Sequence, residues 1–287
     1  MSLSLETKID KCQDSILPSP THFCVVGPGK AGTTWLYELF KKCDHIANSK
    51  IKEAYFFSEG SNLSYSDYLS LFRFNQETKA FGDISNQYYM NIEWVVPRCL
   101  EFFPDSVFVI MLRDPLQRLL SCYRFELKQG RRLSLAEYLN CLKKIDFSNA
   151  NLLSNLLELA PNNKIIAVAF SELNNDPEAA AVTILSGLGV DLPDIDFSAL
   201  NKNASVQPRS ASVARIGRAV AGTLRKTRQF STLQRCKSSV FLNKLIYTAS
   251  PIDINRSDIS LAEEFLGEVA AEPVPIKTEI FNSEVIR

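Results

Sequence analysis

The sequence has no excess of charge of either sign, because 32 Lys and Arg residues balance 32 Asp and Glu residues in a chain of 287. A protein without net charge has no overall field that attracts nucleic acid, so any anion must be held by local groups. No apolar run reaches about 18 residues, the minimum for a membrane-spanning helix. The polar residues 1–15 also lack the apolar stretch of a signal peptide. We therefore expect a cytoplasmic protein that binds neither membranes nor nucleic acid.

The cysteines lack the pairing of a disulfide framework or a zinc site. They are odd in number and scattered, and no two of them form a C-x-x-C motif. The seven are Cys12, Cys24, Cys43, Cys99, Cys122, Cys141 and Cys236. This pattern is typical of reduced thiols in a cytoplasm and predicts no metal.

Internal repeats and low-complexity linkers are absent as well. A hydrophobic content of 46% is enough to bury a substantial core in a chain of this length. We expect an N-terminal extension over residues 1–20 and one domain over residues 21–287.

Three short apolar runs predict the strands of a parallel sheet. They span residues 22–26, 107–112 and 165–170, and each is followed by the signals of a helix. Continuous apolar runs are typical of strands covered by helices on both faces. Alternation of such strands with helices predicts an α/β fold with a central parallel sheet flanked by helices.

Several helix ends can be placed from their capping residues. Asp114-Pro115 and Asp176-Pro177 each combine a cap with a proline that starts a helix, and the second helix should end at residues 187–189. The stretches 134–137 and 260–263 both read Ser-Leu-Ala-Glu and predict capping boxes for two further helices.

A glycine-rich loop, residues 27–34 with sequence GPGKAGTT, lies between the first predicted strand and a helix. Backbone N–H groups of such a loop, together with the helix N-terminus, form a phosphate site. Kinase-type loops place lysine after the last glycine. Here Lys30 precedes Gly32, which would put its ammonium over the junction between a phosphate and its leaving partner. The alternative is a merely tight turn.

A second phosphate site is predicted over residues 113–121, with sequence RDPLQRLLS. Arg113 follows a strand, and Ser121 lies two turns into the next helix, so both can converge on one phosphate. The alternatives are an ion pair between Arg113 and Asp114 and a plain helix-surface position for Ser121.

These segments resemble the sulfotransferases that use 3′-phosphoadenosine 5′-phosphosulfate (PAPS). Residues 27–34 are similar to the 5′-phosphosulfate loop of that family, and residues 113–121 to its 3′-phosphate motif. Residues 52–57 (KEAYFF) and 82–88 (GDISNQY) resemble two segments of its bacterial and carbohydrate branch. The resemblance covers about residues 20–210 and implies the P-loop-like, PAPS-binding sulfotransferase fold.

The resemblance also implies roles for single residues. Lys30 would hold the bridging and sulfuryl oxygens, Glu53 would be the general base, and Arg113 and Ser121 would clamp the 3′-phosphate. Residues 201–210 look like a late loop that closes on the nucleotide. The remaining donor-binding candidates are Gly29, Ala31, Gly32, Thr33, Thr34, Arg209 and, less directly, Lys202. The transfer needs PAPS as donor, releases adenosine 3′,5′-bisphosphate and requires no metal.

The sequence departs from the family pattern on the acceptor side. Members of the phenol and steroid type use a histidine base, and neither His22 nor His45 lies in a matching segment. Tyr55, Ile84 and Asn86 replace a histidine, a lysine and a proline of the carbohydrate branch. We therefore expect a small-molecule or sugar acceptor rather than a long sulfated polysaccharide. The aromatic residues Tyr65, Tyr68, Phe72 and Phe74 would belong mostly to the core, with one or two lining the acceptor pocket.

A basic stretch over residues 202–237 contains nine Lys and Arg residues and no acid. It is either a solvated helix face or a cationic lid over bound phosphate. Two other functions stay open: a P-loop kinase or hydrolase, which would need Mg²⁺ and ATP, and a nucleotide-binding module without turnover. The acceptor atom and the oligomeric state are not determined by the sequence.

Overall fold

A computed structural model of the protein describes residues 19–142, 147–200, 206–227, 232, 235, 236, 239, 242, 246–268 and 278–282. Residues 1–18 of the expected N-terminal extension lie outside these ranges, as does Lys202. The first strand begins at Thr21. The division into an extension and one domain stays a prediction.

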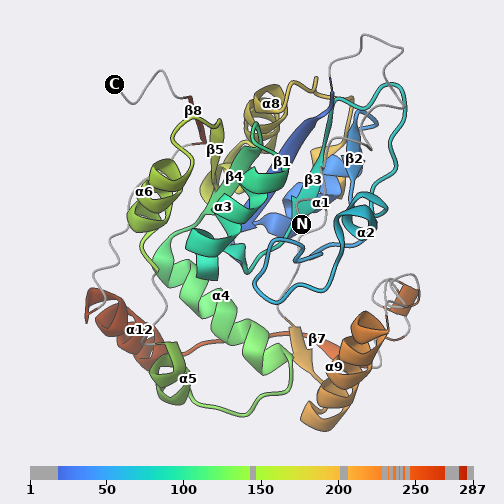
Figure 1. Ribbon diagram of the computed structural model, residues 1–287. Coiled ribbons are helices and arrows are strands. Elements are labelled where there is room, and N and C mark those ends of the chain that lie inside the picture. The colour runs from blue at the N-terminus through green and yellow to red at the C-terminus, as the bar shows by residue number, and fades with distance from the viewer. Residues whose placement is uncertain are drawn as a thin grey trace.

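A six-stranded sheet forms the centre of the described part of the chain, in the order β2-β3-β1-β4-β5-β8 (Figure 1). The first five strands run parallel, and β8 pairs antiparallel with β5. The bounds are β1 Thr21–Gly27, β2 Ile46–Asn48, β3 Ala80–Ile84, β4 Val107–Leu112, β5 Ile165–Ala169 and β8 Glu279–Phe281. The expected α/β class with a central, mainly parallel sheet is confirmed.

Although the sequence predicted only some of the described helices and neither β2 nor β3, helices flank the sheet as expected. Their bounds are α1 Thr33–Phe40, α2 Tyr65–Leu69, α3 Ile92–Phe102, α4 Pro115–Lys128, α5 Leu135–Leu142, α6 Asn149–Leu159, α7 Phe170–Asn175, α8 Pro177–Gly187, α9 Ala211–Lys226 and α12 Arg256–Glu268. Two 3-10 helices, η2 Tyr88–Asn91 and η3 Phe197–Ala199, and an antiparallel pair, β6 Val206–Pro208 with β7 Tyr247–Pro251, complete the described elements.

The two faces of the sheet carry separate cores, because side chains alternate between faces along a strand. Phe23 and Val25 of β1 pack on the side of α1, α7 and α8. Cys24 and Val26 pack on the side of α2, α3 and α6. A third core joins α4, α5 and α12 below the sheet in Figure 1. Full burial on both faces explains why the strands read as continuous apolar runs.

Most predicted helix ends are confirmed. Asp114 accepts a hydrogen bond from the Gln117 backbone and caps α4, Asp176 caps α8 in the same way, and α8 ends at Gly187. Ser134 and Glu137 form the expected capping box, with the Ser134 N–H donating to the Glu137 carboxylate at 2.7 Å.

The predicted capping box at residues 260–263 is wrong. Helix α12 begins one turn earlier, at Arg256, and Ser260 lies inside it. The Asn255 side chain accepts a hydrogen bond from the Asp258 backbone at 2.7 Å and takes the capping role. Asn is as good a cap as Ser, so the earlier signal prevails.

Two further differences concern β5 and β8. Strand β5 ends at Ala169, one residue before the expected end, because Phe170 already begins α7. The antiparallel β8 was not expected, since its three residues are too few for a periodic signal.

The strands β1 and β4 are neighbours that run in the same direction, so the loops after them meet at one edge of the sheet. The glycine-rich loop follows β1, and Arg113 follows β4. The parallel topology therefore brings together two segments that lie far apart in the sequence.

The described cysteines are all free thiols: Cys24, Cys43, Cys99, Cys122, Cys141 and Cys236. Cys12 lies outside the described residues. Within those residues, no helix has both the length and the apolar character needed to cross a membrane.

His22 lies in a buried polar cluster on the face of the sheet that carries α3. Its ring nitrogens are hydrogen-bonded to Ser106 at 2.7 Å and to the Tyr68 hydroxyl at 3.1 Å. The ring also stacks on Phe103 with centroids 3.8 Å apart. Burial lowers the pKa of His22 to about 3, so the folded protein keeps this imidazole neutral in mild acid.

We predict that His22 makes the protein less stable as the pH falls. Below about 6.5 the imidazole binds a proton in the unfolded chain, whereas in the folded protein it does so only near its pKa of about 3. The free energy of unfolding should therefore fall by up to about 1.36 kcal/mol per pH unit through this window. In urea unfolding between pH 7 and pH 4.5, the free energy of unfolding should change less steeply with pH for His22→Phe than for the unaltered protein. Equal slopes would contradict the prediction, since both proteins share every other titrating group.

Candidate active site

The loop over residues 27–34 connects β1 to the N-terminus of α1. Gly27 and Gly32 have φ angles of 103° and 102°, a region that favours glycine. A Cβ on Gly27 would lie 2.8 Å from the Asn86 carbonyl oxygen. Gly32 is the N-cap of α1 and supplies no side-chain hydrogen bond to the first turn. The first amides of α1 thus lack a side-chain cap, as expected where a helix N-terminus receives an anion.

Lys30 lies at the turn of this loop and is not glycine, although its φ is 68°. A left-handed backbone at a non-glycine residue is uncommon and persists when surrounding contacts hold it. Such a contact comes from β4: the Arg113 guanidinium donates a hydrogen bond to the Lys30 carbonyl oxygen at 2.6 Å.

Arg113 is held from two further sides. Its guanidinium lies 4.1 Å from the centre of the Phe170 ring, and its carbonyl oxygen accepts a hydrogen bond from Asn149 at 2.9 Å. The buried Nε has no hydrogen-bond partner among the described residues. A buried donor without a partner is costly, so this guanidinium is well suited to an anion.

One cavity of about 710 Å³ lies between the loop, α1, α4 and the segment after β5. Its walls come from widely separated parts of the chain. The lining residues are Lys30, Gly32, Thr33, Thr34, Trp35, Lys52, Glu53, Asn86, Arg113, Ser121, Phe125, Lys128, Phe170, Leu173, Asn174, Pro177, Phe197, Ser198 and Leu200. This volume is within the range of small-molecule and cofactor sites.

Most residues singled out in the sequence lie at this cavity. The lining includes Lys30, Gly32, Thr33, Thr34, Glu53, Arg113 and Ser121. Gly29 is not among the lining residues and packs against Asn86, whose side-chain nitrogen would lie 3.4 Å from a Cβ on that glycine. Ala31 is fully buried and packs into the core, so only its backbone could serve a ligand.

Arg209 does not reach the cavity lining. It is exposed after β6, and its Nε donates a hydrogen bond to the Tyr247 carbonyl oxygen at 3.2 Å. Arg215, on α9, is also exposed. None of the described residues between 206 and 242 lines the cavity. The solvated face and the lid both stay predictions for the basic stretch.

The cavity gathers positive charge. Among its described lining residues, Lys30, Lys52, Arg113 and Lys128 are cationic, and Glu53 is the acid. Burial lowers the pKa of Lys30, and its cationic neighbours lower it further. Burial likewise lowers the pKa of Lys128 and of Arg113. Clustered cations with lowered pKa values are typical of functional sites.

Aromatic rings hold two of these ammonium groups. The Lys30 Nζ lies 4.1 Å from the centre of the Phe125 ring, and the Lys128 Nζ lies 5.0 Å from that of Tyr247. Such contacts stabilise a cation without neutralising it. Both ammonium groups therefore keep their positive charge at the cavity.

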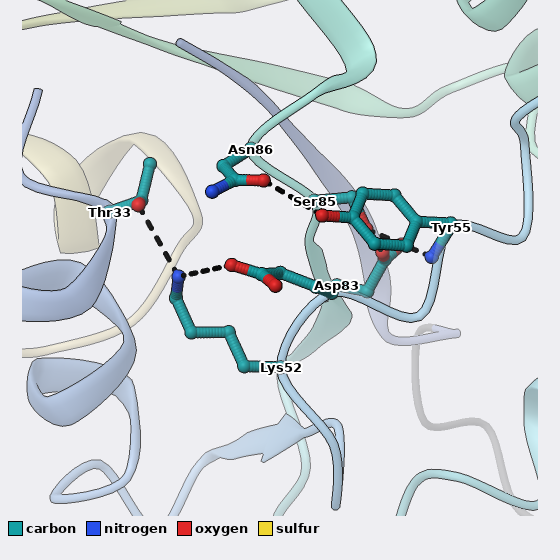
Figure 2. A network of polar contacts seen from close by, with 7 residues as sticks. Thr33, Lys52, Tyr55, Asp83, Ser85 and Asn86 are labelled. Carbon is teal, nitrogen blue, oxygen red and sulfur yellow. Dashed lines mark hydrogen bonds and ion pairs between the residues drawn. The ribbon is translucent and has the colours of Figure 1, made fainter. Parts of the chain in front are cut away.

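Glu53 lies opposite the loop, with Lys52 between them. The Lys52 ammonium donates to the Glu53 carboxylate at 3.3 Å and to the Thr33 hydroxyl at 3.4 Å. Figure 2 shows Lys52 reaching toward Thr33 at the start of α1. The two charged side chains are only 20% and 18% exposed. The contact between Glu53 and Lys52 is thus part of the cavity wall rather than an ordinary surface ion pair.

Several lining residues were missed in the sequence. Phe125 and Lys128 follow Ser121 at spacings of four and seven, and a helix places these positions on one face. That spacing was a usable signal once Ser121 had been singled out. Lys52 and Asn86 lie in the family-like segments 52–57 and 82–88, but no spacing placed their side chains at the cavity, because both belong to irregular loops.

The histidines and the candidate aromatic residues lie elsewhere. His45 precedes β2 at the opposite edge of the sheet, and His22 is buried in the core. Tyr68 and Phe72 belong to the core, whereas Tyr65 and Phe74 are partly exposed. None of these four aromatic residues lines the cavity, so the expected aromatic contribution to the pocket is not found there.

The sequence comparisons match this chain to sulfotransferases. Residues 63–194 match a profile described as "Sulfotransferase family". A 118-residue part is 29% identical to the membrane-associated sulfotransferase kil1 of Dictyostelium discoideum and covers 39% of this chain and 24% of that protein. The chain thus spans about a quarter of that relative's length.

A solved structure has the same fold. The crystal structure of a sulfotransferase from Alicyclobacillus acidocaldarius superimposes with a TM-score of 0.54 and 21% sequence identity. The match covers 65% of this chain and 87% of the other. The backbone superposition confirms the sulfotransferase fold that is expected from the sequence.

We predict that the loop tolerates no side chain at its first glycine. In Gly27→Ala the new Cβ would be strained by the φ of 103° and would overlap the Asn86 backbone. Gly60→Ala is the matched control, because Gly60 also has a positive φ but nothing within 4 Å. Gly27→Ala should lower the free energy of unfolding by about 1–3 kcal/mol more than the control, the usual cost of overpacking. Urea denaturation measures both, and equal losses would show that the contact with Asn86 relaxes freely.

Proposed function

We propose that this chain is a sulfotransferase, which transfers a sulfuryl group from PAPS to a hydroxyl or amine of a small molecule or sugar. Residues 63–194 match the sulfotransferase family profile, and a 118-residue part is similar to a known sulfotransferase. The observation that carries the proposal is the direct contact between Arg113 and the Lys30 turn at one cationic cavity. A ligand with an anionic group at each end can bridge the two segments. PAPS is such a ligand, with phosphosulfate at its 5′ end and phosphate at its 3′ position.

The 5′ end would bind at the loop. The amides of Thr33 and Thr34 begin α1, where a helix favours negative charge. The 3′-phosphate would bind Arg113, whose buried Nε lacks a partner among the described residues, together with Ser121 of α4. Charge-assisted hydrogen bonds of this kind are about twice as strong as neutral ones.

The adenine would lie against aromatic rings of the cavity wall. The Trp35 and Phe197 rings are nearly parallel, with an interplanar angle of 15° and centroids 6.5 Å apart, and both residues line the cavity. Flat aromatic surfaces bind a base by stacking, which tolerates the absence of specific hydrogen bonds.

In the proposed reaction, Glu53 accepts the proton of the acceptor O–H or N–H group. The acceptor atom attacks sulfur, and the bond between sulfur and the bridging 5′-phosphate oxygen breaks. Lys30 neutralises the negative charge that develops on the leaving oxygen. The products are the sulfated acceptor and adenosine 3′,5′-bisphosphate, so no further reactant is needed. Positioning and electrostatic stabilisation supply most of the catalysis, as in phosphoryl transfer.

The charge balance of the cavity supports an acceptor without negative charge. PAPS carries about four negative charges, because a phosphate monoester contributes about two near pH 7. The four cationic side chains among the described lining residues, of which Lys52 already pairs with Glu53, do not exceed this charge. A bound donor would then leave little unpaired positive charge for an anionic acceptor.

We predict that adenosine 3′,5′-bisphosphate and PAPS bind through Lys30 and Arg113. In calorimetry, Lys30→Ala and Arg113→Ala should each weaken binding at least tenfold, because a hydrogen bond to a charged group contributes about 1.5–3 kcal/mol. Lys79→Ala and Arg98→Ala are matched controls, since both side chains form exposed ion pairs away from the cavity. Unchanged affinity in either test variant would remove that residue from the site.

Thermal unfolding in the presence of each ligand separates the proposal from a kinase or hydrolase. A ligand at 100 times its Kd raises the free energy of unfolding by about 2.7 kcal/mol. We expect this stabilisation from PAPS and not from ATP with Mg²⁺. Stabilisation by ATP and Mg²⁺ alone would end the assignment.

We predict that Glu53→Gln binds PAPS normally and loses turnover. General-base catalysis contributes about 10²- to 10⁴-fold, and kcat should fall by that factor. Transfer from labelled PAPS to 4-nitrophenol, a long-chain alcohol, glucosamine and tyramine would first identify a working acceptor, and the variant would then be assayed with it. Glu101→Gln, an exposed carboxylate of α3, is the control. A fully active Glu53→Gln would place the base elsewhere, and PAPS binding without any transfer would indicate a binding module.

A further inference from the structure

The segment that carries Glu53 has an unusual backbone. Glu53 has a φ of 68° and Tyr55 a φ of 54°, although neither is glycine. Left-handed backbone at bulky residues is disfavoured by contact between Cβ and the carbonyl oxygen. Two such residues within three positions persist only if their surroundings fix them. The segment 53–57 must therefore be held from outside.

The restraint comes from the segment that follows β3. The backbone N–H of Glu53 donates to the Ile84 carbonyl oxygen at 3.0 Å. The N–H of Tyr55 donates to the Ser85 hydroxyl at 3.1 Å, and that of Phe57 to the Tyr88 hydroxyl at 3.1 Å. Every second amide of the segment is thus bound. Two of the three acceptors are side-chain hydroxyls.

The Tyr55 side chain returns to the same strand end. Its hydroxyl donates to the Asn86 side-chain oxygen at 2.9 Å. Figure 2 shows Tyr55 contacting Ser85 through its backbone and Asn86 through its ring hydroxyl. The segment 53–57 is therefore held by both backbone and side-chain contacts.

Asp83 lies behind these hydroxyls and is fully buried. The Ser85 hydroxyl donates to its Oδ2 at 2.6 Å, and the Tyr88 hydroxyl donates to the same oxygen at 3.4 Å. Its Oδ1 accepts from the Tyr68 hydroxyl at 3.0 Å. A hydroxyl has a single proton to donate. By taking that proton, the carboxylate directs the lone pairs of Ser85 and Tyr88 toward the amides of Tyr55 and Phe57.

We propose that Asp83 is a positioning residue for catalysis, which acts through Ser85 and Tyr88 to fix the segment 53–57 and so aims the Glu53 carboxylate into the cavity. The inference rests on the proposed role of Glu53 as base. Asp83 does not line the cavity, so it touches no substrate. Its contribution is geometric, since an error of about 1 Å in the placement of a reacting group can cost about 100-fold in rate.

A purely structural role for Asp83 would give a different experimental result from a positioning role. Tyr68 and Tyr88 distinguish the two roles. Tyr68 and Tyr88 are both buried and both donate to Asp83, but only Tyr88 also accepts an amide hydrogen of the Glu53 segment. Loss of either hydroxyl removes a hydrogen bond from the same carboxylate. Only loss of the Tyr88 hydroxyl releases the segment.

The test compares Ser85→Ala, Tyr88→Phe and Tyr68→Phe, with the acceptor identified in the transfer assay. We expect the first two variants to lower kcat at least tenfold while the Kd for adenosine 3′,5′-bisphosphate and the KM for PAPS stay unchanged, because the donor site is intact. Tyr68→Phe should keep its kcat. Ser85→Thr, which keeps the hydroxyl, should recover most of the activity that Ser85→Ala loses. An equal loss of kcat in Tyr68→Phe would reduce Asp83 to a structural role and overturn the inference.

Combination with Glu53→Gln tests whether the network acts through the base. If it does, Ser85→Ala should cause no further loss once the base is gone, since residues that act as a unit are not additive. A full additional loss in the double variant would overturn the inference.

Amide hydrogen exchange measures the same hydrogen bonds independently of catalytic activity. Exchange at Tyr55 should become faster in Ser85→Ala, and exchange at Phe57 faster in Tyr88→Phe, while Tyr68→Phe leaves both unchanged. Unchanged exchange in all three variants would overturn the inference. If Glu53→Gln is fully active, the proposed role of Glu53 as base fails and the inference fails with it, whereas sulfuryl transfer itself still stands. If Glu53→Gln is inactive but Ser85→Ala and Tyr88→Phe are fully active, only the inference fails.

Discussion

The hydrogen bond from the Arg113 guanidinium to the Lys30 carbonyl oxygen is the contact on which the site depends. It joins the end of β4 to the loop after β1 and fixes the left-handed turn at Lys30. The same guanidinium faces the cavity and stacks on Phe170. One side chain therefore shapes the glycine-rich loop and also supplies positive charge to the cavity, where the proposed donor would place a second anionic group. This double use is possible because parallel neighbouring strands end at the same edge of the sheet.

The cavity combines several cations in a partly buried space, an arrangement that is unfavourable without a ligand. Burial and mutual repulsion both lower the pKa of Lys30. Aromatic contacts from Phe125 and Phe170 offset part of this repulsion. The proposed anionic donor would offset the rest, so the charge of the cavity is consistent with the proposed binding of a multiply charged nucleotide. The fold thus concentrates charge locally in a chain whose net charge is zero.

The Glu53 side of the cavity is organised differently. There, backbone strain at Glu53 and Tyr55 is balanced by hydrogen bonds from the segment after β3. A fully buried carboxylate, Asp83, orders those hydrogen bonds from below. A buried charge is tolerated only when its hydrogen bonds are made, and a network of this kind rigidifies what it touches. The two walls of the cavity are therefore fixed by independent means: a guanidinium on one side and a carboxylate with its hydroxyl partners on the other.

The sequence by itself determined the strands β1, β4 and β5 and the caps at Asp114 and Asp176, because these depend on local runs and spacings. The candidate roles of Lys30, Glu53, Arg113 and Ser121 follow from the resemblance to a family and stay predictions. Tertiary structure alone decided that Lys52 and Lys128 line the cavity, that Arg209 lies outside it, and that Asp83 supports the Glu53 segment. It also decided that α12 begins at Arg256, where a better-placed cap preceded the expected one. The physical reason is that local patterns specify backbone conformation, whereas contacts between distant loops follow only from the order and direction of the strands.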